Sequence, residues 1–186
     1  MKSTPMAIPE VLLLEPRVFR DARGFFLESY NRKAFAAVGI SHEFVQCNHS
    51  FSTCGVLRGL HYQIQQPQGK LLRVTQGEIF DVAVDIRRSS PTFGKWVGAI
   101  LSPANMAMFW IPPGFAHGFL VLSATADVQY QATDYYAPAH ERTLVWNDPA
   151  VNIQWPALTA ANAPAQPILS DKDRVGKFLK DAEVYP

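Results

Sequence analysis

Short apolar runs separated by glycine- and proline-containing turns occupy most of the chain between residues 55 and 146. In residues 78–87, Phe80, Val82 and Val84 alternate with a second set that includes Asp81 and Asp85, which is the two-residue period of a β-strand. No convincing helical period occurs between residues 55 and 146. Many short strands with frequent turns are typical of a β-sandwich or barrel, so we predict an all-β fold.

The same pattern of short apolar runs and turns predicts strands on both sides of this region, and helix caps predict one short helix near each end of the chain. Strands are predicted at 11–14, 17–20, 25–30, 55–63, 70–75, 78–87, 95–101, 106–111, 117–122, 127–136 and 143–146. The turn Gln76-Gly77 lies between two of these runs and predicts that 70–75 and 78–87 form a hairpin. Asn31 is a suitable N-cap for one helix and Ser170 for the other. No repeat or linker divides the 186 residues, so we predict one domain over residues 1–186.

The charge and the cysteine content limit the expected partners and location. A formal net charge of +1 does not favour a nucleic-acid binder or an anionic-membrane binder. No apolar run is long enough to span a membrane, and residues 1–5 lack the apolar core of a signal peptide, which predicts a cytoplasmic protein. Cys47 and Cys54 form no CxxC motif, so we expect reduced thiols and no zinc site.

Residues 55–63 break the rules of an ordinary strand. The run Gly-Val-Leu-Arg-Gly-Leu-His-Tyr-Gln has strand composition, yet it contains two glycines and two cationic or titratable side chains. Regular alternation would place Arg58 and His61 on opposite faces, whereas a bulge at Gly59 would bring both to one side. The alternative for His61 is a core histidine with one hydrogen-bonded nitrogen.

Polar side chains interrupt four otherwise apolar segments: Arg58 with His61, Lys70 with Arg73, His117, and Tyr130. Each has a purely structural alternative. Lys70 and Arg73 would be solvated strand residues, His117 a packed histidine, and Tyr130 a core or interface residue. Asp173 lies at the third helical position after Ser170, where a capping box explains it without catalysis.

These side chains predict a metal-free site. A metal-binding barrel needs two histidines at alternate positions of one strand, but Gln63 occupies the partner position of His61, and His117 alone does not complete a three-ligand set. A histidine of near-neutral pKa is a suitable general base, a buried lysine or arginine stabilises an enolate, and a tyrosine returns a proton from another direction. This set suits proton abstraction next to a carbonyl followed by reprotonation on the opposite face, which is epimerisation without a cofactor.

Several long motifs, in order, resemble the dTDP-4-dehydrorhamnose 3,5-epimerase family. They are DxRGxFxESY at 21–30, GVLRGLHYQ at 55–63, GEIFDVAVDIR at 77–87, SPTFGKW at 90–96 and IPPGFAHGF at 111–119. The resemblance extends from about residue 8 to about residue 175. It implies a cupin-like jelly-roll barrel, a homodimer, and no metal or organic cofactor. It implies a dTDP-4-keto-6-deoxyhexose substrate, dTDP-4-dehydro-6-deoxy-D-glucose, on the route to dTDP-L-rhamnose for lipopolysaccharide or cell-wall polysaccharide.

The resemblance also implies roles by motif position. His61 is the general base, Asp173 orients it, Lys70 stabilises the C4 enolate oxygen, and Tyr130, rather than Tyr135 or Tyr136, donates the proton. The positions that match substrate-binding residues are Arg23, Phe26, Glu28, Gln46, Asn48, Arg58, His117, Glu141 and Lys172. The arginines suit a diphosphate, because a guanidinium pairs phosphate oxygens bidentately.

The chain departs from the family pattern at two positions. Cys47 stands where aspartate is common, and strand alternation predicts that its side chain points away from those of Gln46 and Asn48. Arg142 stands after Glu141, where glycine is common.

Other functions fit parts of the sequence. The chemistry is the same for an epimerase that acts only at C3 or only at C5 of a related sugar, and a ketoisomerase of the same superfamily is a more distant possibility. A metal-dependent cupin oxygenase would respond to iron or a chelator. A non-catalytic sugar-nucleotide binding module would explain the arginines, but not His61, Lys70 and Tyr130 together. A nucleic-acid binder lacks the clustered basic stripe that it requires.

Overall fold

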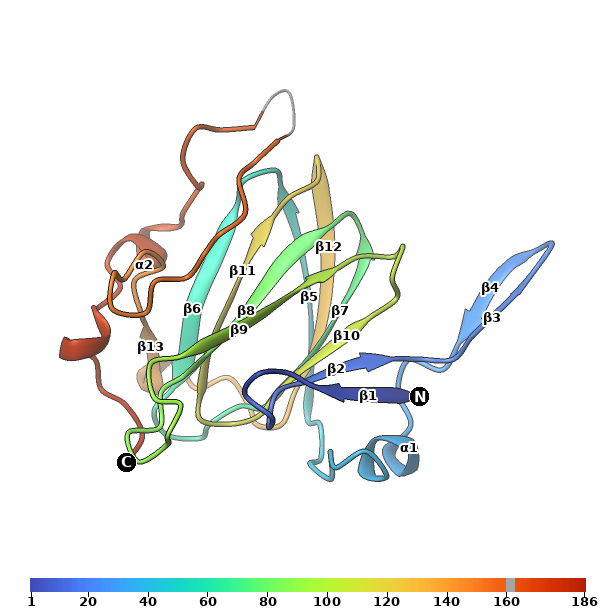
Figure 1. The fold of residues 1–186 in the computed structure, drawn as a ribbon, viewed down its shortest axis with the longest axis horizontal. Helices are drawn as coiled ribbons and strands as arrows, with labels where there is room; N and C mark the ends of the chain where they lie inside the picture. Colours follow the sequence, from blue (N-terminus) through green and yellow to red (C-terminus); the bar gives the residue numbers. More distant parts are fainter. Residues whose placement is uncertain (160–162) are drawn as a thin grey trace.

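Two antiparallel sheets face each other in the computed structural model, which describes residues 1–159 and 163–186 (Figure 1). The six-stranded sheet has the order β1 (Lys2–Pro5), β2 (Leu12–Glu15), β10 (Met108–Ile111), β7 (Lys70–Gln76), β12 (Thr125–Ala132) and β5 (Gln46–Thr53). The five-stranded sheet has the order β13 (Glu141–Thr143), β6 (Leu57–Gln63), β11 (Phe115–Val121), β8 (Ile79–Asp85) and β9 (Trp96–Leu101). This arrangement confirms the predicted all-β, cupin-like jelly-roll barrel.

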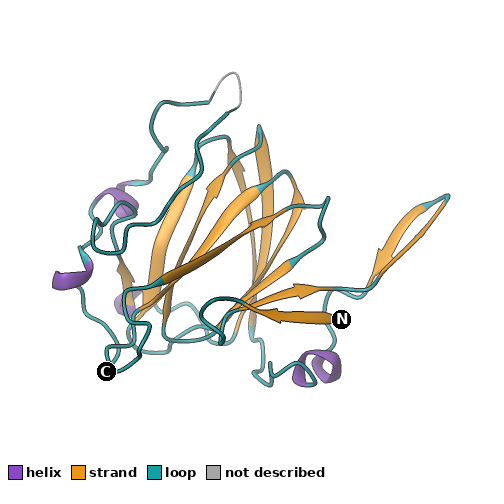
Figure 2. Ribbon diagram, in the orientation of Figure 1, coloured by secondary structure: helices purple, strands orange, loops and turns teal. Residues whose placement is uncertain are grey.

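Helices are short and peripheral, as predicted (Figure 2). Helix α1 (Arg32–Ala36) is capped by the Asn31 side chain, and α2 (Asp171–Arg174) is capped by Ser170. Two 3₁₀ turns, Pro138–His140 and Leu179–Asp181, complete the helical segments of the described chain. A separate hairpin of β3 (Val18–Asp21) and β4 (Gly24–Leu27), here called the arm, projects away from the barrel (Figure 1).

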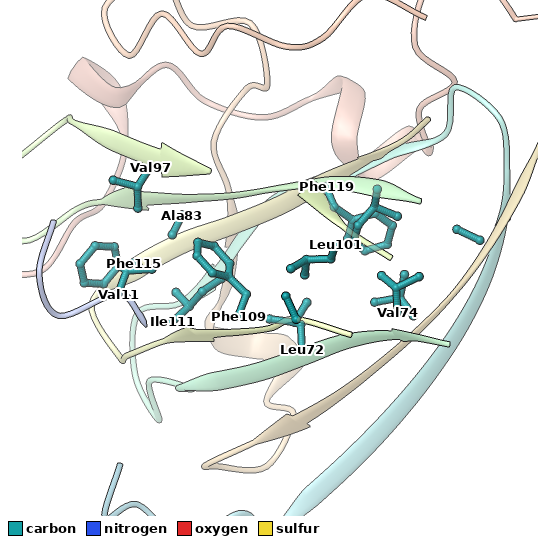
Figure 3. Close-up of a cluster of buried hydrophobic side chains, with 14 of the residues drawn as sticks. Val11, Leu72, Val74, Ala83, Val97, Leu101, Phe109, Ile111, Phe115 and Phe119 are labelled. Atoms are coloured by element: carbon teal, nitrogen blue, oxygen red, sulfur yellow. The ribbon is translucent and has the colours of Figure 1, made fainter. Parts of the chain in front are cut away.

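The core lies between the two sheets and explains the alternation seen in the sequence. Leu72 of β7 and Phe109 of β10 meet Ala83 of β8 and Phe119 of β11 there, all of them buried (Figure 3). The opposite face of the five-stranded sheet is covered by residues that follow β13, with Leu144, Val151 and Leu179 in the second apolar cluster. A third cluster packs Phe35 of α1 against Leu71 and Met108 of the six-stranded sheet.

The predicted hairpin of residues 70–75 and 78–87 is wrong. Strand β7 pairs with β10 and β12, whereas β8 pairs with β11 and β9, so the two runs belong to different sheets. The turn at Gly77, whose φ is 78°, carries the chain from one sheet to the other instead of folding it back. Turn residues between two strands reveal a tight connection, but they do not reveal whether those strands exchange hydrogen bonds.

Two strands were missed, and several boundaries differ. One face of β5 is wholly polar and the other mixes Cys47 and Phe51 with His49 and Thr53, so the strand lacks the clear apolar–polar alternation that marks a half-buried strand. Strand β1 is short and mostly exposed at the edge of its sheet. The strand predicted at 127–136 is Thr125–Ala132, and the one predicted at 143–146 is Glu141–Thr143.

Candidate active site

A cavity of about 330 Å³ lies between the two sheets and gathers most of the predicted site residues. Its lining includes nine of them: Gln46, Asn48, Arg58, His61, Lys70, His117, Tyr130, Glu141 and Lys172. Asp173 lies directly behind His61. Arg23, Phe26 and Glu28 do not line this cavity.

Strand β6 contributes both Arg58 and His61, and the predicted bulge is present. Its register against β11 pairs His61 with His117 and Arg58 with Phe119, so β6 has an extra residue between these two pairs. The shift turns Arg58 and His61 toward the same cavity. The Arg58 guanidinium is oriented from β5, because its Nε donates to Ser52 Oγ at 3.0 Å and its Nη2 donates to the Phe51 carbonyl oxygen at 3.2 Å.

His61 and Asp173 form a hydrogen-bonded pair across 112 positions of sequence, with 2.6 Å between His61 Nε2 and Asp173 Oδ1. Asp173 is buried, and it also accepts a bond from Ser170 Oγ at 2.6 Å. Helix α2 is held at this point by main-chain bridges on both sides, one at Ile168 and one at Lys177. Ser170 Oγ caps α2 by accepting from the Asp173 N–H, which is half of the expected capping box, while the Asp173 carboxylate bonds Ser170 Oγ and His61.

Burial and hydrogen bonding oppose each other in this pair. Burial lowers the pKa of His61 below 6.5, because the hydrogen bond to Asp173 only partly offsets the loss of solvation, and the nearby Lys172 and Lys70 charges lower it further. Burial alone would raise the pKa of Asp173, but the bonds from His61 and Ser170 outweigh it and hold this pKa below its usual value. Asp173 is therefore ionised, and His61 is neutral at pH 7, as a general base must be.

Lys70 reaches the cavity from the other sheet. It lies on β7, is 9% exposed, and its Nζ is 3.5 Å from the His61 carbonyl oxygen. Burial lowers the pKa of Lys70 to about 8, while the charges of Asp81 and Glu141 oppose that change and the charge of Lys172 adds to it. A buried ammonium in this position can stabilise negative charge that develops on a bound ligand.

Tyr130 enters from β12, which neighbours β7 in the six-stranded sheet. Burial raises its pKa, with Arg58 acting in the opposite direction, so the phenol is protonated and able to donate. His61 belongs to the five-stranded sheet. The candidate base and the candidate acid thus stand on opposite walls of one cavity.

The polar residues at the rim are organised into small networks. Gln46 donates to Asn48 Oδ1 at 2.9 Å, and the exposed Cys47 between them lines a different, smaller hollow, as its predicted outward direction requires. Glu141 accepts from Lys172 Nζ at 2.6 Å and from the Tyr136 hydroxyl at 2.9 Å. Glu141 lines the cavity although Arg142 follows it.

The sequence interpretation missed several lining residues: Ser50, Tyr62, Gln63, Gln68, Phe119 and Tyr136. Ser50 lies on the same side of β5 as Gln46 and Asn48, so strand alternation would have found it had β5 been recognised. Its hydroxyl oxygen is buried without a hydrogen-bond partner in the described structure. The predicted cluster partner Arg73 lies outside this cavity and lines the same smaller hollow as Cys47.

The part of the chain that the structure describes contains neither a metal-binding cluster nor a membrane-spanning helix. Within residues 1–159 and 163–186, no three His, Cys, Asp or Glu side chains are grouped so that they could hold a metal ion. In the same residues, no helix has the length and apolar character needed to cross a membrane.

Comparisons with known proteins match this chain to a family over nearly its whole length. The family model described as dTDP-4-dehydrorhamnose 3,5-epimerase matches residues 5–181. The chain belongs to this family. A Pseudomonas aeruginosa protein of the same name is 60% identical over the full length of both chains. The solved Legionella pneumophila epimerase, a complex with dTDP-4-keto-L-rhamnose, has a TM-score of 0.92 and 51% identity, covering 98% of this chain and 94% of its own.

Three of the predicted substrate-binding residues lie on the arm or directly after it, outside the cavity. Arg23 and Phe26 are exposed on the arm, with the Arg23 guanidinium paired to Asp21 at 2.6 Å. Glu28 follows the arm, is exposed, and accepts a bond from Asn31. Within one chain, the fold therefore does not bring these three predicted binding residues to the cavity.

Proposed function

We propose that this chain converts dTDP-4-dehydro-6-deoxy-D-glucose into dTDP-4-dehydro-L-rhamnose by inverting C3 and C5. Membership of the epimerase family supports the reaction, and the ligand in the Legionella pneumophila complex supports the substrate class. The observation that carries the mechanism is the placement of His61 and Tyr130 on opposite walls of one cavity. Inversion requires a base on one face of the reacting carbon and an acid on the other.

In this mechanism the C4 ketone acidifies the protons on C3 and C5. His61 removes the proton from the carbon, and the electron pair of the broken C–H bond forms an enolate whose C4 oxygen is stabilised by the Lys70 ammonium. Tyr130 then donates a proton to the opposite face of the carbon, most clearly at C5. The His61 imidazolium and the Tyr130 phenolate return to their starting forms by exchanging protons with water. Asp173 holds the imidazole in position and stabilises its charged form.

The remaining cavity residues bind the substrate. Arg58 suits the diphosphate, because its guanidinium is oriented by Ser52 and faces the cavity. Gln46 and Asn48 on β5, His117 on β11, Glu141 on β13 and Lys172 on α2 supply further donors and acceptors around the sugar nucleotide.

The arm favours a homodimer in which each copy completes the site of the other. The arm exposes Phe19, Phe25 and Phe26, each about half or more accessible to solvent, and it also carries Arg23. Insertion of this hairpin into a second copy would bury the phenyl rings and bring Arg23, Phe26 and Glu28 to a diphosphate or nucleoside. We also place the enzyme in the cytoplasm, on a route that supplies rhamnose to lipopolysaccharide or cell-wall polysaccharide.

Proton NMR of the purified protein with dTDP-4-dehydro-6-deoxy-D-glucose in deuterated buffer containing a chelator tests this proposal. We expect deuterium at both C3 and C5, and an L-configured product after trapping with a downstream reductase. Exchange at C3 alone would assign a mono-epimerase. Exchange that requires added metal would overturn the His61 mechanism, and binding without exchange would indicate a non-catalytic module.

A further inference from the structure

Strand β8 sends a carboxylate into the interior of the barrel. Asp81 is fully buried, and its neighbours on the same side of the strand include the core residues Ile79 and Ala83. Burying a carboxylate is costly unless the charge is paired and hydrogen-bonded. Asp81 does not line the substrate cavity, so direct contact with substrate does not explain it.

His117 is the side chain that Asp81 holds. His117 Nε2 lies 3.0 Å and 3.2 Å from the two carboxylate oxygens of Asp81. Strand β11 pairs with β8 over this region, and His117 is 7% exposed. A carboxylate on one imidazole nitrogen fixes the tautomer, so Nε2 carries the hydrogen and Nδ1 carries the lone pair. This contact sets both the orientation and the hydrogen-bonding character of His117 at the cavity wall.

The negative charge of Asp81 also raises the pKa of Lys70, which comes from the opposite sheet, and so opposes the effect of burial. Asp81 on β8 and Glu141 on β13 raise the pKa of Lys70, and Lys172 on α2 lowers it. The other charged or titratable side chains that line the same cavity as Lys70 are Arg58, His61 and Tyr62 on β6, His117 on β11, Tyr130 on β12, and Tyr136. Of the two carboxylates, Glu141 is already paired with Lys172 at 2.6 Å. Asp81 contacts only an imidazole among the described residues, which leaves its charge available to the nearby ammonium.

We propose that Asp81 is a positioning residue that acts through two cavity side chains. It orients His117 toward the substrate, and it supplies the buried negative charge that keeps Lys70 protonated beside the enolate oxygen. The second part rests on the proposed function, because the proposed function assigns Lys70 to the enolate.

Asp81→Asn tests the proposal, because it removes the charge and keeps the shape. We expect kcat/KM to fall about 10- to 100-fold. When kcat/KM is plotted against pH, the fall on the alkaline side, here called the alkaline limb, should move to lower pH by about one unit, because Lys70 loses a nearby anion. A role in stability alone would leave the limb unmoved. Nitrogen-15 NMR of labelled lysine, with Lys70 assigned by its loss in Lys70→Met, measures the same shift without substrate. Histidine ring nitrogen shifts report the tautomer of His117.

Asp85→Asn is the matched control. Asp85 is equally buried and lies on the same side of β8, but it accepts bonds from Arg87, Ser90 and Thr92. We expect this variant to lose stability but to keep the wild-type pH profile and Lys70 titration. Asp81→Glu restores the charge, so it should retain the Lys70 titration while the displaced carboxylate disturbs His117 and raises KM. This variant also keeps the proposal testable if Asp81→Asn does not fold.

Failure of the proposed function and failure of the Asp81 proposal give different results. A wild-type protein that exchanges no deuterium overturns the proposed function, whereas the Lys70 titration and the His117 tautomer still test Asp81. An active wild-type protein, together with an Asp81→Asn variant whose alkaline limb, Lys70 titration and His117 tautomer are all unchanged, overturns the role of Asp81. A wild-type Lys70 titration in Asp81→Asn combined with an altered His117 tautomer would likewise remove Lys70 from the proposal.

Discussion

Single residues in the cavity set the pH range in which the mechanism operates. His61 must be neutral to accept a proton, and Lys70 must be charged to stabilise an enolate. Burial lowers the pKa of both groups, to below 6.5 for His61 and to about 8 for Lys70. The two residues therefore delimit a window around neutral pH.

The dependence of kcat/KM on pH should be bell-shaped. Activity falls on the acidic side as pH drops through the pKa of His61, which lies below 6.5, because the base becomes protonated. Activity falls on the alkaline side as pH rises through about 8, because Lys70 loses its charge. Initial rates of epimerisation across this range measure both limbs. A plateau that continues past pH 10 would exclude Lys70 as the charged group.

Asp173→Asn isolates the contribution of the carboxylate behind His61. The amide keeps the size of the side chain but cannot stabilise a developing imidazolium, so we expect turnover to fall about 10²- to 10⁴-fold. Asp171→Asn is the matched control, because Asp171 lies in the same helix with its side chain fully exposed. Turnover and melting temperature should be measured for both. Wild-type turnover in Asp173→Asn would contradict the assignment.

Strands β6 and β11 approach each other closely on the side of the cavity that carries Arg58 and His61. Gly59 has φ of +124°, and a Cβ atom placed there would lie 2.5 Å from the Gly118 Cα of β11. Both glycines therefore permit the two strands to meet at the bulge that turns Arg58 and His61 to one side.

Gly59→Ala should be more harmful than its backbone angle alone explains. Gly24→Ala provides the comparison, because Gly24 has φ of +127° and nothing within 4 Å of its added Cβ. Backbone strain costs about 1–3 kcal/mol in either variant. The overlap with β11 should add about 2 kcal/mol or more for Gly59→Ala alone. Urea unfolding measures both values, and equal losses would show that β11 yields without cost.

The sequence predicted the irregular strand β6 better than it predicted the connections and pairings around that strand. The glycines and the mixed character of residues 55–63 indicated a bulge, and β6 contains it. The hairpin at Gln76-Gly77 was wrong, because local turn chemistry does not encode which sheet the next strand joins. The pairing of His61 with Asp173 was expected from family resemblance, since no local pattern relates residues 112 positions apart. Ser50 and Tyr136 were missed because polar strands and loops carry no periodic signal.

The barrel contains the proposed catalytic residues, whereas three of the proposed binding residues lie away from them, Arg23 and Phe26 on the arm and Glu28 directly after it. Arg23 is exposed and paired only with Asp21 of the same hairpin in the described chain. The proposed dimer explains this separation, because two-fold symmetry would place each arm at the cavity of the other copy. Arg23→Ala should then reduce kcat/KM about 10- to 100-fold through the loss of a diphosphate contact.

Mixed dimers decide which cavity an arm serves. We consider a purified heterodimer, isolated by two different affinity tags, of one chain carrying His61→Asn and one carrying Arg23→Ala. If the arm acts on the other copy, one cavity has both His61 and an intact arm, so activity should recover to roughly half of wild type.

The control heterodimer combines a wild-type chain with a chain carrying both substitutions, and it should be nearly inactive because each cavity then lacks one residue. The opposite result, an inactive first pair and a half-active control, would show that each arm serves its own cavity. Equal activity in the two heterodimers would remove Arg23 from the site altogether.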